Sequence, residues 1–269
     1  MFKPQLAYNY ANKPQSSGYS QPKLDGIRCI AKRDGLFTRS GNKILSCNHI
    51  HNALNKFFLD HPNAILDGEL YSHKLRSDFN KISSLVRKFK TTKKESEECS
   101  KYIQYHIYDM YGDNKFSERI NYLKSQKFNL PIVIVETTLC KNQDDLNKMY
   151  SIYLSDGYEG QMVRNNKPYE NKRSINLLKR KEFITEEFNV VDVLEGSGSW
   201  SGYAKSFILD IGDGRTFGSG VKGNQSALKA LLQQKIKPDW VTVKYFEKSL
   251  NGVPRFPIAV DWGQNARFD

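Results

Sequence analysis

The pattern of apolar and turn residues changes near residue 184, and this change limits the folds open to the chain. Before it, strand-like and helix-like segments mix without the regular strand–helix–strand repeat of a parallel sheet, which predicts an α+β domain. After it, short strand-like runs such as Phe207–Ile211 and Val241–Phe246 are separated by glycine-rich turns. Short strands with a single helix are typical of a small β-barrel. We therefore expect two domains, residues 1–184 and 185–269.

The expected elements of the first domain follow from hydrophobic periodicity. After an irregular segment over residues 1–20, strands are expected at 20–32, 36–40, 64–66, 102–110, 132–139, 160–164 and 175–181. Helices are expected at 48–59, 78–89, 117–130 and 144–154, and the charged residues 90–100 are expected to form a loop. No internal repeat interrupts this mixture.

The balance of charge favours a polyanionic partner. The 269 residues include 41 Lys and Arg against 29 Asp and Glu, a net charge of +12. Such an excess favours nucleic acid, nucleotide phosphates or an anionic membrane face, although a basic surface can also bind nothing. No apolar run approaches the roughly 18 residues of a membrane span, and residues 1–19 lack the apolar core of a secretory signal. The four cysteines form no CxxC pair, so we expect reduced thiols in a cytosolic compartment.

The run Lys23-Leu24-Asp25-Gly26-Ile27-Arg28 carries the densest chemistry in the sequence. Alternation places Lys23, Asp25 and Ile27 on one face of an extended segment. A lysine amine becomes a nucleophile when a cationic or desolvated site lowers its pKa, and Gly26 allows a ligand to approach the backbone closely. The alternative is an exposed turn with an ordinary solvated lysine, which one isolated match does not exclude.

Further segments follow this run in order: Thr38-Arg39-Ser40-Gly41-Asn42, Leu66-Asp67-Gly68-Glu69-Leu70, Ile107-Tyr108-Asp109-Met110-Tyr111, Glu159-Gly160-Gln161-Met162-Val163-Arg164 and Leu177-Leu178-Lys179-Arg180-Lys181-Glu182-Phe183. Their order and spacing resemble the covalent nucleotidyltransferase superfamily of ATP-dependent DNA ligases, RNA ligases and mRNA capping enzymes. The form of the first motif and the tail Asn251–Pro257 look most like the small viral and phage ATP-dependent DNA ligases. The resemblance implies an ATP-grasp-like adenylation (nucleotidyltransferase) domain of antiparallel sheets with helices, followed by an OB-fold β-barrel.

The resemblance also implies a reaction in three steps. A lysine attacks the α-phosphate of ATP to give lysyl-AMP and pyrophosphate, the AMP moves to the 5′-phosphate at a nick, and the 3′-hydroxyl displaces AMP to seal the strand. ATP and Mg²⁺ are then the cofactors, and nicked duplex DNA is the partner, bound through its backbone by the basic excess. No protein or membrane partner is implied, and we expect a monomer in the cytoplasm, or in the host cytoplasm for a phage or virus.

The motifs assign catalytic roles residue by residue. Lys23 is the expected nucleophile and the site of AMP attachment. Lys179 and Lys181 lie two apart, hence on one face of a strand, and would neutralise charge on the phosphates together with Mg²⁺; taken alone, this run also fits a solvated charge cluster. Glu159 is the expected Mg²⁺ ligand, with Asp25 as a second, because Mg²⁺ prefers carboxylate oxygen and water.

Nucleotide and DNA contacts are assigned in the same way. Glu69 would contact the ribose hydroxyls, and Tyr108 would stack under adenine, a contact worth about 1–3 kcal/mol. Arg28 and Arg39 are expected at the nucleotide and nick phosphates, which a guanidinium fork matches, and Arg180 is expected to face protein or DNA. The alternatives are a polar turn for Glu69, a half-buried strand tyrosine for Tyr108 and ordinary surface arginines.

Some features depart from the family pattern. The C-terminal motif is represented only by Arg267-Phe268-Asp269, Arg164 stands where lysine is common, and Val221–Gln225 leaves little room for the insertion with which some small ligases encircle DNA. Two rival interpretations stay open: an RNA ligase or capping guanylyltransferase of the same superfamily, and a catalytically inactive nucleic-acid-binding relative. As a DNA ligase, the protein would serve DNA replication, repair and recombination.

Overall fold

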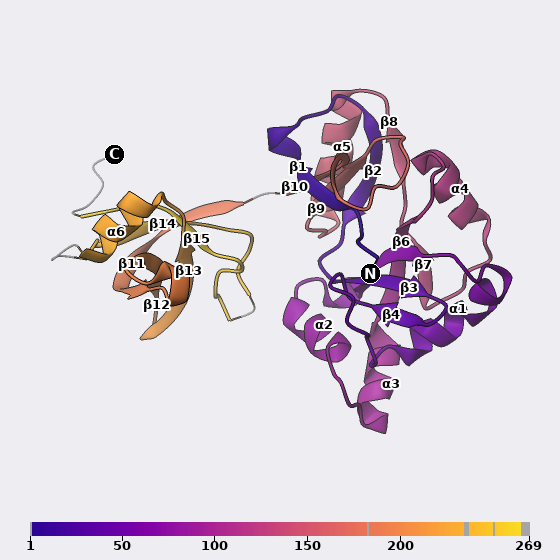
Figure 1. The fold of residues 1–269 in the computed structure, drawn as a ribbon, viewed down its shortest axis with the longest axis horizontal. Coiled ribbons are helices and arrows are strands. Elements are labelled where there is room, and N and C mark those ends of the chain that lie inside the picture. Colours follow the sequence, from indigo (N-terminus) through magenta and orange to yellow (C-terminus); the bar gives the residue numbers. More distant parts are fainter. Residues whose placement is uncertain (1, 182, 234–236, 250, 265–269) are drawn as a thin grey trace. The chain divides into compact units, whose positions relative to one another are not determined.

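The computed structural model describes residues 2–181, 183–233, 237–249 and 251–264. The chain divides after Lys181 into two compact units, a few residues before the expected boundary (Figure 1). Within the described ranges, no helix is both long and apolar enough to cross a membrane.

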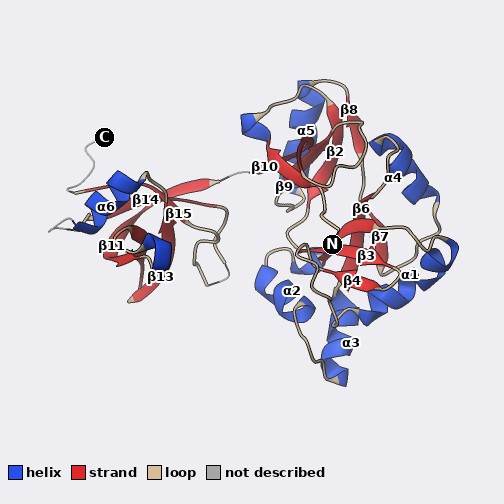
Figure 2. Ribbon diagram, viewed as in Figure 1, coloured by secondary structure: helices blue, strands red, loops and turns tan. Residues whose placement is uncertain are grey.

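The first unit is built on two five-stranded sheets (Figure 2). The first sheet has the order β1-β10-β9-β2-β8, with β1 at Leu6–Asn9, β10 at Arg173–Lys181, β9 at Gly160–Arg164, β2 at Gly18–Lys23 and β8 at Thr138–Cys140. The second sheet has the order β4-β3-β5-β6-β7, with β4 at Gly35–Phe37, β3 at Ile27–Lys32, β5 at Leu66–Tyr71, β6 at Gln104–Met110 and β7 at Ile132–Ile134. Because β1 runs parallel to β10 and β6 runs parallel to β7, both sheets are mixed, which corrects the purely antiparallel expectation.

Helices supply the apolar surfaces that bury these sheets. They are α1 (Asn48–Asp60), α2 (Phe79–Val86), α3 (Lys93–Tyr102), α4 (Phe116–Ser125) and α5 (Gln143–Ser155), with short 3₁₀ turns η1 (Tyr10–Asn12) and η2 (His73–Leu75). Helices α1 to α4 share one core with the second sheet, whereas Leu146 of α5 packs with Val163 and Leu178 of the first sheet. In α1, the buried residues recur at helical spacing, as expected: Ile50, Leu54, Phe57 and Phe58.

The helix α3 was expected to be a loop, and that expectation is wrong. Its sequence is highly charged, and Cys99 is its buried residue, so apolar periodicity could not reveal it. A capping box starts the helix: the Thr92 side chain accepts from the Glu95 amide, and the Glu95 carboxylate accepts from the Thr92 amide. Reciprocal capping of this kind satisfies backbone donors that would otherwise lack partners.

The expected continuous strand over residues 20–32 is divided between the two sheets. Strand β2 ends at Lys23 in the first sheet, and β3 begins at Ile27 in the second. The expected strand over 132–139 divides in the same way, into β7 and β8. Alternating apolar residues indicate an extended chain, but they carry no information about which sheet each half joins.

All four cysteines are buried free thiols. Cys47 and Cys99 are distant in sequence but lie in contact, and their sulfur atoms are 3.7 Å apart. Burial raises the pKa of the Cys29 thiol, which leaves little thiolate to react. Because all four thiols are buried, we expect the native protein to react with a thiol-specific chromogenic disulfide far more slowly than the denatured chain. Rapid modification of a thiol in the native protein would contradict this burial.

The second unit is a closed barrel with the strand order β11-β12-β13-β15-β14, which confirms the expected OB-fold class. Its elements are β11 (Ile184–Glu195), η3 (Gly198–Trp200), β12 (Ala204–Gly212), β13 (Arg215–Val221), α6 (Gln225–Gln233), β14 (Trp240–Tyr245) and β15 (Ile258–Gly263). Strand β15 had not been expected. Because β13 ends at Val221 and α6 begins at Gln225, the junction is short, in line with the sequence. The expected motif Arg267–Asp269 lies outside the described residues.

Candidate active site

Lys23 lies where the chain leaves the first sheet for the second. It is the last residue of β2, and the next strand starts at Ile27. Gly26 makes this crossing possible, because a Cβ there would lie 2.4 Å from the carbonyl oxygen of Leu70 and 2.8 Å from Cγ of Glu69. Gly26 thus lets strand β5 approach the crossing; it also lines the neighbouring cavity, and the close approach of a ligand that the sequence suggested stays a prediction.

Strand register brings Glu159 and Lys181 to Lys23. Gly160 of β9 pairs with Lys23 on one side and with Lys181 on the other. The Glu159 carboxylate accepts hydrogen bonds from Nζ of Lys23 and, at 3.1 Å, from Nζ of Lys181. Its own amide donates to the Lys23 carbonyl oxygen at 3.1 Å. Two ammonium groups therefore share one carboxylate that is only 6% exposed.

The electrostatics of this cluster favour an anionic ligand. Burial raises the pKa of Glu159, but Lys23 and Lys181 outweigh burial and hold that pKa below its ordinary value. Burial lowers the pKa of Lys179, and the charges of Lys181 and Lys23 lower it further. These lysines repel one another, so a bound phosphate group would relieve the repulsion.

A cavity of about 710 Å³ opens beside Lys23 in the first unit. This volume falls within the roughly 300–1,000 Å³ typical of small-molecule sites. Several expected site residues line it together: Lys23, Arg28, Arg39, Glu69, Tyr108 and Lys179. Glu159 and Lys181 adjoin this wall through the ion pairs they form around Lys23. The structure therefore assembles into one site residues that are spread over most of the first unit's sequence.

Glu69 lies in β5 within this cavity wall, not in the turn that was its alternative interpretation. Burial raises the pKa of its carboxyl group to about 8, although Lys23 and Arg28 act in the opposite direction. A carboxyl group held partly protonated near neutral pH can both donate and accept hydrogen bonds. This capacity suits the expected contact with ribose hydroxyls.

Replacing Glu69 by Gln is expected to remove a pH-dependent loss of stability. The native carboxyl has its pKa raised to about 8, whereas an unfolded glutamate titrates near about 4.3. The native state therefore holds its proton over this range, and the stability that Glu69 contributes falls as pH rises from about 4.3 to about 8. In urea denaturation of nucleotide-free protein, the free energy of unfolding of the variant should increase relative to that of the wild type as pH rises. A constant difference in free energy of unfolding would contradict the raised pKa.

Arg28 is not the free surface arginine that the sequence allowed. Its Nε donates to Oδ1 of Asp67 at 2.9 Å and its Nη2 to Oδ2 at 2.5 Å. The Tyr169 hydroxyl donates to the same Asp67 carboxylate at 2.6 Å. Arg28 therefore forms part of the cavity wall through a bidentate pair, and its expected contact with the nick phosphate remains a prediction.

Tyr108 lies in the cavity wall, and two guanidinium groups approach its ring. Arg164 lies 5.3 Å and Arg28 lies 5.9 Å from the ring centroid. Burial raises the pKa of its hydroxyl, so the ring stays neutral. A neutral aromatic ring on the wall of a nucleotide-sized cavity is suited to stacking on a base.

The two remaining expected residues, Arg39 and Arg180, lie in different surroundings. Arg39 is exposed at the cavity rim. Arg180 faces away from the lysine cluster, with its guanidinium 4.0 Å from the Tyr150 ring centroid and a 2.9 Å hydrogen bond to Asn147. It therefore contacts protein, and its expected contact with DNA stays a prediction.

Asp25 lies in the crossing between the two sheets, after β2 ends at Lys23 and before β3 begins at Ile27. The described cavity wall includes Leu24 and Gly26 but not Asp25. Among the described residues, no group of three or more His, Cys, Asp or Glu side chains is placed to hold a metal ion. Glu159 and Asp25 both stay predicted metal ligands, and Glu159 is the one whose contact with Lys23 the structure shows.

The sequence interpretation missed a buried polar network beneath Tyr108. Asp109 accepts from Arg119 at 2.8 and 3.0 Å and from Arg164 at 3.0 Å. Arg164 also donates to the Gln21 side chain at 2.8 Å, and Gln21 donates to the Tyr108 carbonyl oxygen at 3.0 Å. The network joins β2 and β9 of one sheet to β6 of the other. It thereby fixes the strand that carries Tyr108.

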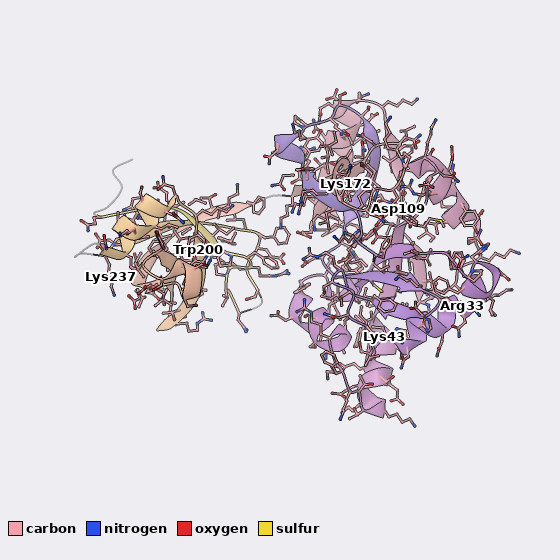
Figure 3. All side chains as sticks on the ribbon, in the orientation of Figure 1. Arg33, Lys43, Asp109, Lys172, Trp200 and Lys237 are labelled. Carbon is pink, nitrogen blue, oxygen red and sulfur yellow. The ribbon has the colours of Figure 1, made fainter. Side chains whose placement is uncertain are left out.

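One sequence feature could have revealed this network. Tyr105, Ile107 and Asp109 occupy alternate, buried positions of β6. A carboxylate in register with core residues needs a buried cationic partner. The labelled position of Asp109 can be followed in Figure 3.

A cavity lined by an ion-paired lysine, an aromatic ring and further cations, on a two-sheet unit followed by an OB-fold barrel, defines a covalent nucleotidyltransferase. Residues 4–181 match the family model described as ATP dependent DNA ligase domain. The chain therefore belongs to the family of ATP-dependent DNA ligases, enzymes that seal nicks through an adenylate intermediate.

Similar proteins of known identity agree with this assignment. A DNA ligase of Haemophilus influenzae is 28% identical over 257 residues, which span 93% of this chain and 88% of the relative. A DNA ligase of African swine fever virus is 27% identical over 251 residues, and the match spans 86% of this chain but only 56% of the viral enzyme. A solved structure from work on Lig E DNA ligases has a TM-score of 0.81 and 26% identity, covering 97% of this chain and 99% of that one. The Chlorella virus DNA ligase-adenylate, at 22% identity and a TM-score of 0.51, shares the fold.

Proposed function

We propose that this chain seals nicks in duplex DNA with ATP, and that Lys23 carries the AMP. Nζ of Lys23 attacks the α-phosphorus of ATP, a P–N bond forms and pyrophosphate leaves. The AMP passes to the 5′-phosphate at the nick, and the 3′-hydroxyl then displaces it. The observation that supports Lys23 most directly is its place in the cavity wall, ion-paired to Glu159 beside Lys181.

The other residues would position the nucleotide and balance its charge. Tyr108 would stack on adenine, and Glu69 would bind the ribose hydroxyls. Lys179 and Lys181 would neutralise charge that develops on the phosphate oxygens. Nζ of Lys23 donates a hydrogen bond to Glu159, so the amine must leave this carboxylate and pass a proton to water before its lone pair attacks phosphorus.

Glu159 is suited to hold Mg²⁺ in the manner usual for nucleotide enzymes. Mg²⁺ is commonly bound by one or two protein carboxylates, with water and substrate phosphates completing its shell. A single buried carboxylate beside the nucleophile fits that mode. When bound, the ion would supply positive charge to the phosphate oxygens.

The acceptor that this site best supports is a nicked DNA duplex. Basic side chains line the cavity rim: Arg39, Lys43, Arg87, Lys88 and Arg173. Contacts from such residues bind the phosphate backbone without regard to sequence. We propose that the enzyme acts on this substrate as a monomer. A cytoplasmic location, a viral or phage origin and roles in replication, repair and recombination remain predictions.

Nucleotide and polymer specificity can be tested together. The protein, first freed of bound AMP with pyrophosphate, is incubated with Mg²⁺ and α-labelled ATP or GTP. We expect a covalent adduct with ATP, and sealing of a nick in DNA rather than one between two RNA ends. An adduct with GTP alone would support a capping enzyme, preference for RNA ends would support an RNA ligase, and no adduct would support an inactive relative.

A further inference from the structure

The connection between α2 and α3 carries an unusually exposed aromatic residue. Phe89 is 81% exposed, the largest exposed fraction among the large apolar side chains in the described part of the chain. Its neighbours are Arg87, Lys88 and Lys90, and we call the segment 87–90 the basic tip. The tip follows the end of α2 at Val86 (Figure 1).

Contacts at its base hold the basic tip in place. Nζ of Lys88 donates to Oε1 of Glu95 at 2.5 Å. The same Glu95 forms the capping box with Thr92 at the start of α3. Lys88 is tied to this cap, and Arg87, Phe89 and Lys90 on either side of it are exposed.

The basic tip borders the cavity that contains Lys23. Arg87, Lys88 and Phe89 line this cavity, as do Arg39 and Lys43 from the loop after β4. An apolar ring thus stands among cations at the edge of the site. Neither water nor an apolar protein surface complements that combination, whereas nucleic acid offers flat bases and sugars between regularly spaced phosphates.

We propose that Phe89 packs against a base or deoxyribose of the bound DNA next to the nick, while Arg87 and Lys90 contact the flanking phosphates. This inference rests on the proposed function, because it assumes that the acceptor enters at the Lys23 cavity. It assigns the nonpolar part of DNA binding to the first unit. The two kinds of contact can be distinguished by experiment, because the affinity from stacking is nearly independent of salt concentration whereas the affinity from phosphate contacts is not.

Binding to a fluorescently labelled nicked duplex, measured over a series of salt concentrations, tests the proposal. Phe89→Ala is expected to raise Kd by about tenfold, the loss expected for one aromatic–nucleotide contact, without altering the slope of log Kd against log salt. The double variant Arg87→Ala/Lys90→Ala should reduce the magnitude of that slope by about two. Phe89→Tyr should bind like the wild type.

Leu59 provides the matched control, because it is 72% exposed at the end of α1. Leu59→Ala should bind DNA as the wild type does. Equal affinity of Phe89→Ala and Leu59→Ala would overturn the proposal, as would a change in salt slope for Phe89→Ala. Adduct formation by the wild type is measured separately: its absence would refute the proposed function, whereas a sealing enzyme that is indifferent to Phe89 would refute only this inference.

Discussion

Lys23→Ala is expected to lose sealing of a nick that ends in a 5′-phosphate, by more than about 10³-fold, a loss of the size seen when a nucleophile is removed. The same variant should still seal a nick whose 5′-phosphate already carries AMP. The physical reason is that, in the proposed mechanism, Nζ of Lys23 takes AMP from ATP and passes it on, whereas the final displacement joins two DNA groups.

Sealing of both substrates is followed with end-labelled DNA on denaturing gels. Lys172→Ala is the matched control, because Lys172 is 72% exposed and lies outside the cavity wall; its place is labelled in Figure 3. This control should seal both substrates at the wild-type rate. Sealing of the 5′-phosphate nick by Lys23→Ala would refute Lys23 as the nucleophile.

Asp109→Ala is expected to lower the free energy of unfolding by about 3–5 kcal/mol, the usual loss when one partner of a buried ion pair is removed. Asp109 is fully buried, and Arg119 and Arg164, each 4% exposed at the side chain, both bind its carboxylate. Without it, two guanidinium groups would remain in the interior with their charge uncompensated. Because the network holds β6 in place, nucleotide affinity should fall as well.

Urea denaturation with a fluorescence probe measures this loss. Asp113→Ala, at an exposed position shortly after β6, is the control and should change stability by less than about 0.5 kcal/mol. A loss below about 1 kcal/mol for Asp109→Ala would show that the two arginines find other partners, contrary to the structure.

Much of the fold could be predicted because local patterns determine it. The residues Ile50, Leu54 and Phe57 recur at helical spacing and form the buried face of α1. The strands β9 and β10 lie close to their expected limits. Helix α3 could not be found in this way, because a capping box and one buried cysteine specify it.

The residues that form the candidate site could also be predicted, but the contacts between them could not. Ordered motifs brought Lys23, Glu159 and Lys181 into consideration, and strand register then joined them. The sequence did not indicate that Arg28 would be bound to Asp67, nor that the chain would leave the first sheet directly after Lys23. The first outcome depends on how β3 and β5 pair within the second sheet, and the second depends on where the chain crosses between sheets; both are tertiary properties.

The most direct test of the central claim is to locate the adduct. Protein freed of AMP is incubated with Mg²⁺ and ATP, digested, and analysed by mass spectrometry under conditions that preserve the phosphoramidate bond. We predict AMP on the peptide that contains Lys23, at Nζ of that residue. AMP on Lys179, Lys181 or any other residue, or no adduct on protein shown to be free of AMP, would contradict the account.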